Sequence, residues 1–305
     1  MQAIVLSEYG DPNRLELRER PEPEPGAGQI KVRVASASLN PVDWKLRSGA
    51  LQKMVPLELP TILGRDAAGE VVRIGAGVTE FKEGDHVLGL VNGAYAQYVV
   101  AGTEAWAKIP EGLAPKDAGA LPLALLTGDQ LAEATLGPSA GAGLTVLVTG
   151  ALGSVGRVAA WGIRQRGARV LAGVRSKQVD EAQSLNVDGV VAIDDDVAIA
   201  QLPELDCIAD TVGGETISKL VPKIKKSGTL GSVLGEPKAA KERGLMVVAI
   251  MAHADGEHLT RLAAAVAAGS LKIPIDQRFP LAEAPAAHAL AEQGGIGKVL
   301  LMPFA

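Results

Sequence analysis

The spacing of apolar and polar residues divides the chain into β-rich ends and an alternating middle. Up to about residue 101, short runs rich in Val, Ile or Tyr are separated by Gly, Pro and Asp, which predicts strands at 1–6, 29–37, 67–74, 86–90 and 94–101. Residues 115–131 predict a long helix that bends or breaks at Pro122, because proline removes a helical hydrogen bond.

From about residue 144 the pattern alternates between strand and helix. Strands are expected at 144–149, 169–174, 189–193, 206–211, 229–233 and 245–251, with helices at 154–166, 178–185 and 215–224 between them and a further helix at 257–268. Single helices between strands imply a parallel sheet that is covered on both faces. Strand patterns return at 277–281 and 298–302. We therefore expect an α/β protein in which a β-rich domain (1–125 and 269–305) surrounds a doubly wound parallel-sheet domain (126–268).

The sharpest local signal is the segment VLVTGALGSVG at residues 146–156, which reads as strand, tight turn and helix. Gly150 permits the turn, Gly153 lets the backbone approach a pyrophosphate, and Gly156 lets helix and strand pack closely. The helix N-terminus favours the negative charge of the phosphates. The turn therefore predicts a dinucleotide site that also includes Leu152, Ser154 and Val155, although glycines are common in ordinary strand-to-helix turns.

The tip of the next strand indicates which dinucleotide is bound. An NAD site normally has an acid there to bind the ribose 2′-hydroxyl. Here the tip is Arg175, Ser176 and Lys177, and there is no acid between residues 170 and 179. Two cations and a hydroxyl suit a 2′-phosphate, which favours NADPH. The alternative is a solvated loop, in which Arg and Lys are ordinary residues.

Composition limits the function classes. The chain has 305 residues, a net charge of −5 and 47% hydrophobic residues, which is typical of a globular protein without general affinity for nucleic acid or anionic membranes. Its apolar runs are too short for a membrane span, and its N-terminus lacks the features of a signal peptide. The lone Cys207 excludes an internal disulfide and fits a reducing cytoplasm. We expect a cytoplasmic protein.

Several segments together resemble zinc-independent medium-chain reductases of the quinone oxidoreductase and alkenal/enone reductase group. The matching segments are NPVDWKLRSG (40–49), LPTILGRDAAGEVVRIG (59–75), FKEGDHVLG (81–89), GAYAQYVV (93–100), ALPLALLTGDQLAEA (120–134), DCIADTVGGET (206–216) and GKVLL (297–301). The resemblance covers essentially the whole chain. It implies a GroES-like substrate domain with an inserted Rossmann domain, NADPH in the cleft between them, and a homodimer.

The same resemblance bears on zinc. Zinc-dependent relatives carry a His-Glu pair where this chain has Arg65 and Asp66, together with cysteine ligands that this chain lacks. Of the four histidines only His253 and His258 are close in sequence, so we expect no functional zinc. Without a metal, the favoured reaction is hydride addition to the β-carbon of an enone or enal, or to a quinone, because donors can stabilise the resulting anion.

The resemblance also nominates site residues. It places Lys45 beside cofactor and substrate, where Lys45 holds the nicotinamide ribose and donates to the substrate carbonyl, and it directs Asn40 into the same cleft. Without the resemblance, Lys45 reads as a surface lysine and Asn40 as a turn residue. Thr127 is expected to reach the nicotinamide or a phosphate, or else to pack inside a helix. Four further cofactor contacts follow the fourth and fifth strands of the doubly wound domain: Val212, Gly213, Leu234 and Gly235.

Two features qualify this interpretation. Leu51 stands where quinone reductases commonly have a second tyrosine, which favours a small aliphatic enone over a bulky quinone. The acidic run 194–196 stands where the family often has a tyrosine contact, and we interpret it as a solvated turn. The alternatives are a non-catalytic NADPH-binding redox sensor and a trans-acting enoyl reductase of a biosynthetic pathway.

Overall fold

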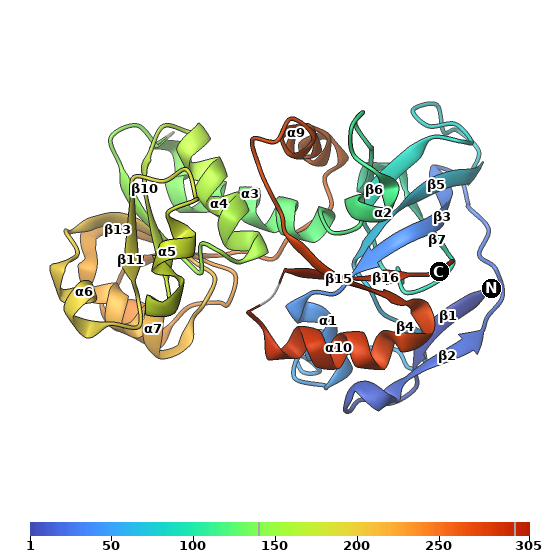
Figure 1. The fold of residues 1–305 in the computed structure, drawn as a ribbon, viewed down its shortest axis with the longest axis horizontal. Coiled ribbons are helices and arrows are strands. Elements are labelled where there is room, and N and C mark those ends of the chain that lie inside the picture. The colour runs from blue at the N-terminus through green and yellow to red at the C-terminus, as the bar shows by residue number, and fades with distance from the viewer. Residues whose placement is uncertain (140, 296) are drawn as a thin grey trace. The chain divides into compact units, whose positions relative to one another are not determined.

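The computed structural model describes residues 1–139, 141–295 and 297–305, and Figure 1 shows its ribbon. The chain forms two compact units. Unit 1 consists of Met1–Leu123 and His253–Ala305, and unit 2 is Ala124–Ala252. The first unit is therefore discontinuous, and the second is inserted into it.

Unit 1 is built around a seven-stranded sheet. Its strands are β3 (Gln29–Ser38), β5 (Asp66–Ile74), β6 (His86–Leu90), β7 (Tyr98–Gly102), β8 (Trp106–Lys108), β15 (Ile275–Pro280) and β16 (Lys298–Met302). Their order is β15-β16-β3-β5-β6-β8, and β7 also pairs with β3. The last strand of the chain thus pairs with β3 from its beginning, Leu301 opposite Ala37 (Figure 1).

A smaller sheet and four α-helices complete unit 1. The small sheet has the order β2-β1-β4, from Leu15–Glu19, Gln2–Leu6 and Thr61–Ile62. The helices are α1 (Pro41–Arg47), α2 (Pro115–Ala118), α9 (Gly256–Ala267) and α10 (Ala284–Gln293). Three 3₁₀ turns accompany them: η1 (Pro12–Arg14), η2 (Thr103–Ala105) and η6 (Leu281–Glu283).

Unit 2 is a doubly wound sheet of parallel strands. Its strands are β9 (Thr145–Thr149), β10 (Arg169–Val174), β11 (Gly189–Ala192), β12 (Leu205–Asp210), β13 (Ile224–Ser232) and β14 (Met246–Ala249). Their order is β11-β10-β9-β12-β13-β14 and every pairing is parallel. The strand order reverses between β9 and β12, and ligands bind at such a switch point in open α/β sheets.

Helices cover both faces of this sheet, as the alternating pattern predicts. They are α3 (Pro122–Leu136), α4 (Ser154–Gln165), α5 (Val179–Ala182), α6 (Asp196–Gln201), α7 (Gly214–Leu220) and α8 (Lys238–Glu242), with 3₁₀ turns η3 (Gly137–Ser139), η4 (Ser176–Gln178) and η5 (Val221–Lys223). Val146 and Val148 of β9 belong to the core with α4, whereas Leu147 between them belongs to the core with α7. This alternation is the period-2 side-chain pattern of a strand buried on both faces.

The structure differs from the expected elements in several places, and strands β2 and β8 and helices α6 and α8 are among the elements that were not expected. The end of unit 2 lies at Ala252, not at 268, because α9 packs against β8 and η2 of unit 1. Strand β13 begins at Ile224, five residues before its expected start. Helix α10 was not expected. The break at Pro122 is confirmed, since α2 ends at Ala118 and α3 begins at Pro122.

Neither unit contains a candidate membrane span. Within the residues that the structure describes, every helix is too short or too polar to cross a bilayer.

A buried histidine connects α1 to α10 in unit 1. Arg47 Nη1 lies 3.3 Å from Nδ1 of the fully buried His288, and Arg47 Nη2 pairs with Glu292 at 2.5 Å. The ring of Tyr95 meets that of His288 edge-on, with centroids 5.7 Å apart. Burial, assisted by the charge of Arg47, lowers the pKa of His288 from 6.5 to about 3. The imidazole is therefore neutral in the folded protein at physiological pH.

This histidine predicts a loss of stability in mild acid. In the unfolded state His288 has a pKa of 6.5, whereas in the folded state its pKa is about 3. The unfolded state therefore binds the proton first as the pH falls, and the free energy of unfolding decreases below pH 6.5. Between pH 7 and 5 the loss is about 2 kcal/mol. Urea unfolding of wild type and His288→Gln at both pH values measures it. The variant keeps an acceptor for Arg47 and should flatten the pH dependence, whereas His86→Gln, at an exposed site, should not. Equal slopes for wild type and His288→Gln would contradict the assignment.

Candidate functional site

The glycine turn of unit 2 has the geometry that a dinucleotide requires. Gly150 follows β9 with a φ of +64°, in the left-handed region, and a Cβ there would lie 2.6 Å from Oγ1 of Thr211. A Cβ on Gly156 would lie only 2.2 Å from the carbonyl oxygen of Gly150. Both positions disfavour any larger residue: Gly150 because Thr211 lies against it, and Gly156 because the first turn of α4 lies directly over the backbone of Gly150.

Gly153, the middle glycine of the turn, is exposed. A Cβ on Gly153 would meet only the Gly150 carbonyl oxygen, 3.2 Å away, within 4 Å. Gly153 is the N-cap of α4, and no side chain caps the helix. Leu152, Ser154 and Val155, which flank Gly153, are partly exposed. The first N–H groups of a twelve-residue helix are thus available to an anion, and the turn fits the pyrophosphate of a dinucleotide.

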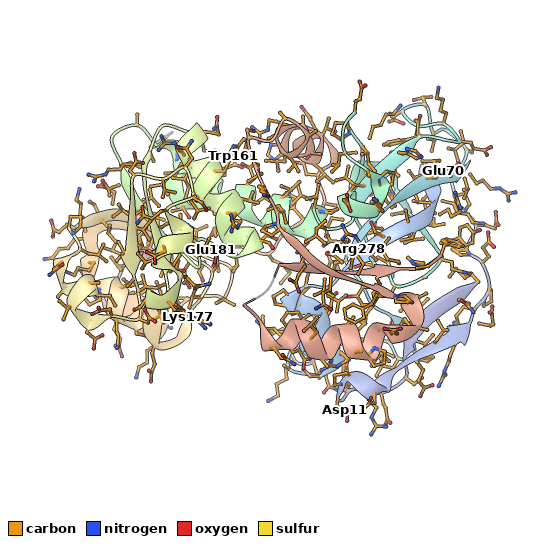
Figure 2. The ribbon with its side chains drawn as sticks, viewed as in Figure 1. Asp11, Glu70, Trp161, Lys177, Glu181 and Arg278 are labelled. Carbon is orange, nitrogen blue, oxygen red and sulfur yellow. The ribbon has the colours of Figure 1, made fainter. Side chains whose placement is uncertain are left out.

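The tip of β10 carries the expected cations and one unexpected acid. Arg175, Ser176 and Lys177 are exposed, and Figure 2 shows Lys177 at the surface of unit 2. The backbone N–H and the Oγ–H of Ser176 both donate to Asp194 Oδ1, at 2.7 Å each. Donation from Ser176, and to a smaller extent the charge of Arg175, lowers the pKa of Asp194. Residue 194 lies in an exposed turn, as expected, and its carboxylate is in addition bound to the tip of β10.

Asp210 organises the loops that follow β12 and β13. Its Oδ1 accepts from Thr149 Oγ1 at 2.8 Å and from the N–H groups of Val212 and Gly213 at 3.1 and 3.0 Å. Its Oδ2 accepts from Ser232 Oγ at 3.3 Å. Asp210 is 1% exposed, so no water could take its place as the hydrogen-bond acceptor for these donors. One buried carboxylate therefore ties three strand ends together.

Apolar side chains lie exposed at the same edge. Val212 is 44% exposed and Leu234 is 46% exposed, whereas residues 207–210 of β12 are buried. Leu234 packs over Gly213, where a Cβ would lie 2.7 Å from Leu234 Cδ1. Gly235 has a φ of +89°. The structure thus brings the glycine turn, the tip of β10 and both expected loop contacts to the carboxyl edge of one sheet.

Thr127 lies on α3 and is 8% exposed. The next residue, Gly128, packs against α4, since a Cβ on Gly128 would lie 2.7 Å from the Val155 carbonyl oxygen. Thr127 is therefore held near the first turn of α4, and its contact with a cofactor stays a prediction.

In unit 1, Asn40 belongs to a buried polar network. Its Nδ2 donates to Asp66 Oδ2 at 2.8 Å, and its Oδ1 accepts from Lys298 Nζ at 2.6 Å. Ser38 Oγ also donates to Asp66 Oδ2, at 2.5 Å. Asn40 is 3% exposed. Because both ends of its amide are occupied, Asn40 holds the N-terminus of α1, and its expected catalytic contact stays a prediction.

The network contains two acids and one lysine away from water. Asp43 Oδ2 accepts from the Asn40 N–H at 2.8 Å, which caps α1. Burial raises the pKa of Asp43 to about 7, with a further contribution from Asp66. Burial lowers the pKa of Lys298. The two shifts have the same cause, since low dielectric disfavours both charged forms.

Two cations next to this network have no acid partner. Lys45 lies on α1, partly buried, and no described side chain forms an ion pair with it. Arg65 precedes Asp66, and its Nε is buried without a hydrogen-bond partner among the described residues. The acids of this region, Asp43 and Asp66, are buried and form no ion pair with either cation, and the contact of Lys45 with a cofactor or substrate stays a prediction. Sequence reasoning named Lys45 but missed Arg65, Lys298, Asp194 and Asp210.

A zinc site is not assembled by these residues. Within the described ranges, no group of three or more His, Cys, Asp or Glu side chains is placed to hold a metal. Arg65, where zinc-dependent relatives have histidine, cannot serve as a ligand because guanidinium is always protonated.

Comparison with known proteins agrees with this architecture. Residues 26–111 match the family model of the alcohol dehydrogenase GroES-like domain, and residues 185–301 match that of zinc-binding dehydrogenases. The chloroplast envelope quinone oxidoreductase homolog of Arabidopsis thaliana is 30% identical over 288 residues, 88% of each chain. The chloroplastic NADPH-dependent alkenal/one oxidoreductase of the same plant is 30% identical over 322 aligned positions, 100% of this chain and 80% of that protein. The structure of the quinone oxidoreductase from Coxiella burnetii superposes with a TM-score of 0.87 at 28% identity over 99% of each chain.

A GroES-like domain interrupted by a doubly wound parallel sheet defines a medium-chain dehydrogenase/reductase. The chain belongs to this family, in the group of quinone oxidoreductases and alkenal/one oxidoreductases, which its sequence resembles. It is an oxidoreductase of a nicotinamide-dependent family.

The role of Asp210 can be tested with a matched pair on β12. Asp210→Ala leaves buried donors unpaired, so the free energy of unfolding should fall by about 3 kcal/mol and NADPH affinity by about tenfold. Asp206, near the other end of β12, accepts from the Thr145 N–H and pairs with Lys225. Asp206→Ala should lower stability but leave NADPH affinity unchanged. Urea unfolding and calorimetric titration measure both quantities, and equal affinity in the two variants would refute a positioning role for Asp210.

Proposed function

We propose that this protein is an NADPH-dependent, zinc-independent reductase of α,β-unsaturated carbonyls or quinones. The observation that carries the proposal is the pair of exposed cations, Arg175 and Lys177, beside a glycine turn that fits a pyrophosphate. A related alkenal/one oxidoreductase is NADPH-dependent by name, which supports the same cofactor.

Different residues of unit 2 bind different parts of the cofactor. The N–H groups at the start of α4 hold the pyrophosphate, and Arg175 and Lys177 bind the 2′-phosphate. Val212, Gly213, Leu234 and Gly235 supply an apolar rim at the carboxyl edge, to which Asp210 gives a defined shape. When bound, NADPH supplies a hydride to the β-carbon of the substrate.

Lys45 acts on the negative charge that the substrate acquires. Its ammonium has no acid partner among the described residues, so it is available to donate to the carbonyl oxygen as charge develops there. Asn40, Asp66 and Lys298 hold the start of α1 and thereby the helix that carries Lys45. These residues support a reaction without zinc. Arg65 and Asn40 carry cationic and amide nitrogens, which are not the His, Cys or carboxylate ligands that zinc requires.

Two further parts of the proposal concern assembly and location. Strand β14 is an edge of its sheet and carries Met246, which is 66% exposed. An exposed edge strand is a template for pairing with another chain, which supports a homodimer.

The lone cysteine, Cys207, is buried and free, which supports a reducing compartment such as the cytoplasm.

The direct test is NADPH oxidation with a panel of small enones, enals and quinones. At least one member should accelerate oxidation, with small aliphatic enones ahead of bulky quinones. If NADPH binds and no member is reduced, the protein is a non-catalytic NADPH-binding sensor. A thioester enoyl substrate in the panel identifies a trans-acting enoyl reductase.

Lys45→Ala should lower kcat by about 100-fold with the best panel substrate, since a donor to the developing oxyanion is lost. Lys45→Arg should retain part of the rate. Stability should change by less than about 1 kcal/mol, because Lys45 forms no ion pair with any described side chain. Lys53→Ala, at an exposed lysine, is the matched control. NADPH affinity, titrated separately, shows whether Lys45 also holds the cofactor. An unchanged kcat would remove Lys45 from the mechanism.

Arg175→Glu should raise the KM for NADPH far more than the KM for NADH, because a carboxylate there repels a 2′-phosphate but accepts a bond from a 2′-hydroxyl. A ratio change of about 100-fold corresponds to losing one charge-assisted contact and gaining a repulsive one. Steady-state kinetics with both cofactors measures it. Equal effects on the two KM values would refute the assignment of the 2′-phosphate to Arg175.

A further inference from the structure

The acid at the tip of β10 comes from the neighbouring strand. Strands β10 and β11 are parallel with Val174 opposite Ala192, and the Ile193 N–H donates to the Val174 carbonyl oxygen at 2.8 Å. Asp194 is the next residue, so the sheet itself delivers its carboxylate beside Arg175 and Ser176. The backbone before Asp194 is held by the pairing of β11 with β10, and Asp194 itself lies in the turn before α6.

This carboxylate occupies donors that a 2′-phosphate would use. Ser176 gives both its N–H and its Oγ–H to the same atom, Asp194 Oδ1. Hydroxyl and backbone N–H groups are common phosphate ligands, and here both are engaged. The cations that remain are Arg175 and Lys177, so the local charge is two positive and one negative. Asp194 is ionised at neutral pH, since its bonds from Ser176 and the charge of Arg175 lower its pKa.

The two nicotinamide cofactors respond to this carboxylate in opposite ways. A phosphate monoester carries nearly two negative charges at pH 7 and is repelled by a carboxylate beside its binding cations. A ribose 2′-hydroxyl is a donor and can donate a hydrogen bond to an adjacent carboxylate. That is the part an acid plays at the end of the second strand in NAD-binding sheets. In this chain the acid is present, but it follows the third strand of the sheet.

We propose that Asp194 is a specificity-determining residue that weakens the preference of this site for NADPH and allows NADH to compete. The inference rests on the proposed dinucleotide site. It assigns the cations to the 2′-phosphate of one cofactor and Asp194 to the 2′-hydroxyl of the other.

The test uses the two adenosine fragments that differ only in the group concerned. Calorimetry measures the Kd of 2′,5′-ADP and of 5′-AMP for the full protein, for Asp194→Asn and for Asp196→Asn. Asparagine keeps an acceptor for Ser176 while removing the charge. Asp196 pairs with Lys219 at 2.7 Å, so Asp196→Asn removes the same charge two residues away.

Asp194→Asn should raise the affinity for 2′,5′-ADP relative to 5′-AMP by about fivefold, and Asp196→Asn should leave the ratio unchanged. Asp194→Ala, which also frees Ser176, should raise the ratio at least as much. In steady-state kinetics, kcat/KM for NADPH over NADH should move in the same direction.

A loss of affinity for both fragments in equal proportion would mean that Asp194 only shapes the turn, and would overturn the inference while leaving the dinucleotide site intact. A ratio that falls would overturn it as well. Wild-type protein that binds neither fragment would overturn both the inference and the proposed function.

Discussion

The parallel pairing of β9 with β10 on one side and β12 on the other decides where unit 2 can bind a ligand. Because parallel strands end at the same edge, Gly150, Arg175 and Thr211 follow their strands side by side. Local backbone geometry then determines where helix α4 begins. The left-handed Gly150 and the close contact of Gly156 with its carbonyl hold α4 over the turn, so the helix N-terminus points at the same edge. Asp210 completes the arrangement by bonding the N–H groups of the loop after β12.

In unit 1, a network of buried charged and polar side chains holds helix α1 in place. A helix of seven residues has little stability of its own, and α1 depends on what holds its first turn. Asp43 caps the backbone, and Lys298 and Asp66 take the two ends of the Asn40 amide. Burying these groups is costly, so the bonds that Asn40 makes to Asp66 and Lys298 hold the network in place, although Oδ1 of Asp43 is buried without a hydrogen-bond partner among the described residues. The orientation of α1 follows from that arrangement.

The sequence predicted what depends on local patterns. The glycine turn, the strand–helix alternation and the break at Pro122 are set by φ preferences and apolar spacing, which a window of about fifteen residues contains. What it missed depends on residues that meet only after folding. Asp194 reaches Ser176 across eighteen positions, and Lys298 reaches Asn40 across 258. An acid search confined to residues 170–179 could not see a carboxylate that the next strand delivers. Helix α10 was missed for another reason, since its alanine-rich sequence with Pro285 near its start gives a weak periodic signal.

Charge is segregated in this chain, and the segregation explains how an acidic protein can hold anionic ligands. The net charge is −5, yet Lys45, Arg65 and Lys177 form no ion pair with any described side chain. In unit 1, Asp43 and Asp66 are turned into the core, where Asp43 accepts from the Asn40 N–H and Asp66 pairs with Lys298. In unit 2 the nearest acid, Asp194, is not buried but is bound to Ser176. An acid whose charge is offset by a buried cation, as that of Asp66 is by Lys298, reduces the field of a neighbouring cation less than an acid without such a partner. The first arrangement suits a site that must stabilise a charge developing on substrate. The second suits a site that distinguishes the 2′-phosphate of one cofactor from the 2′-hydroxyl of the other.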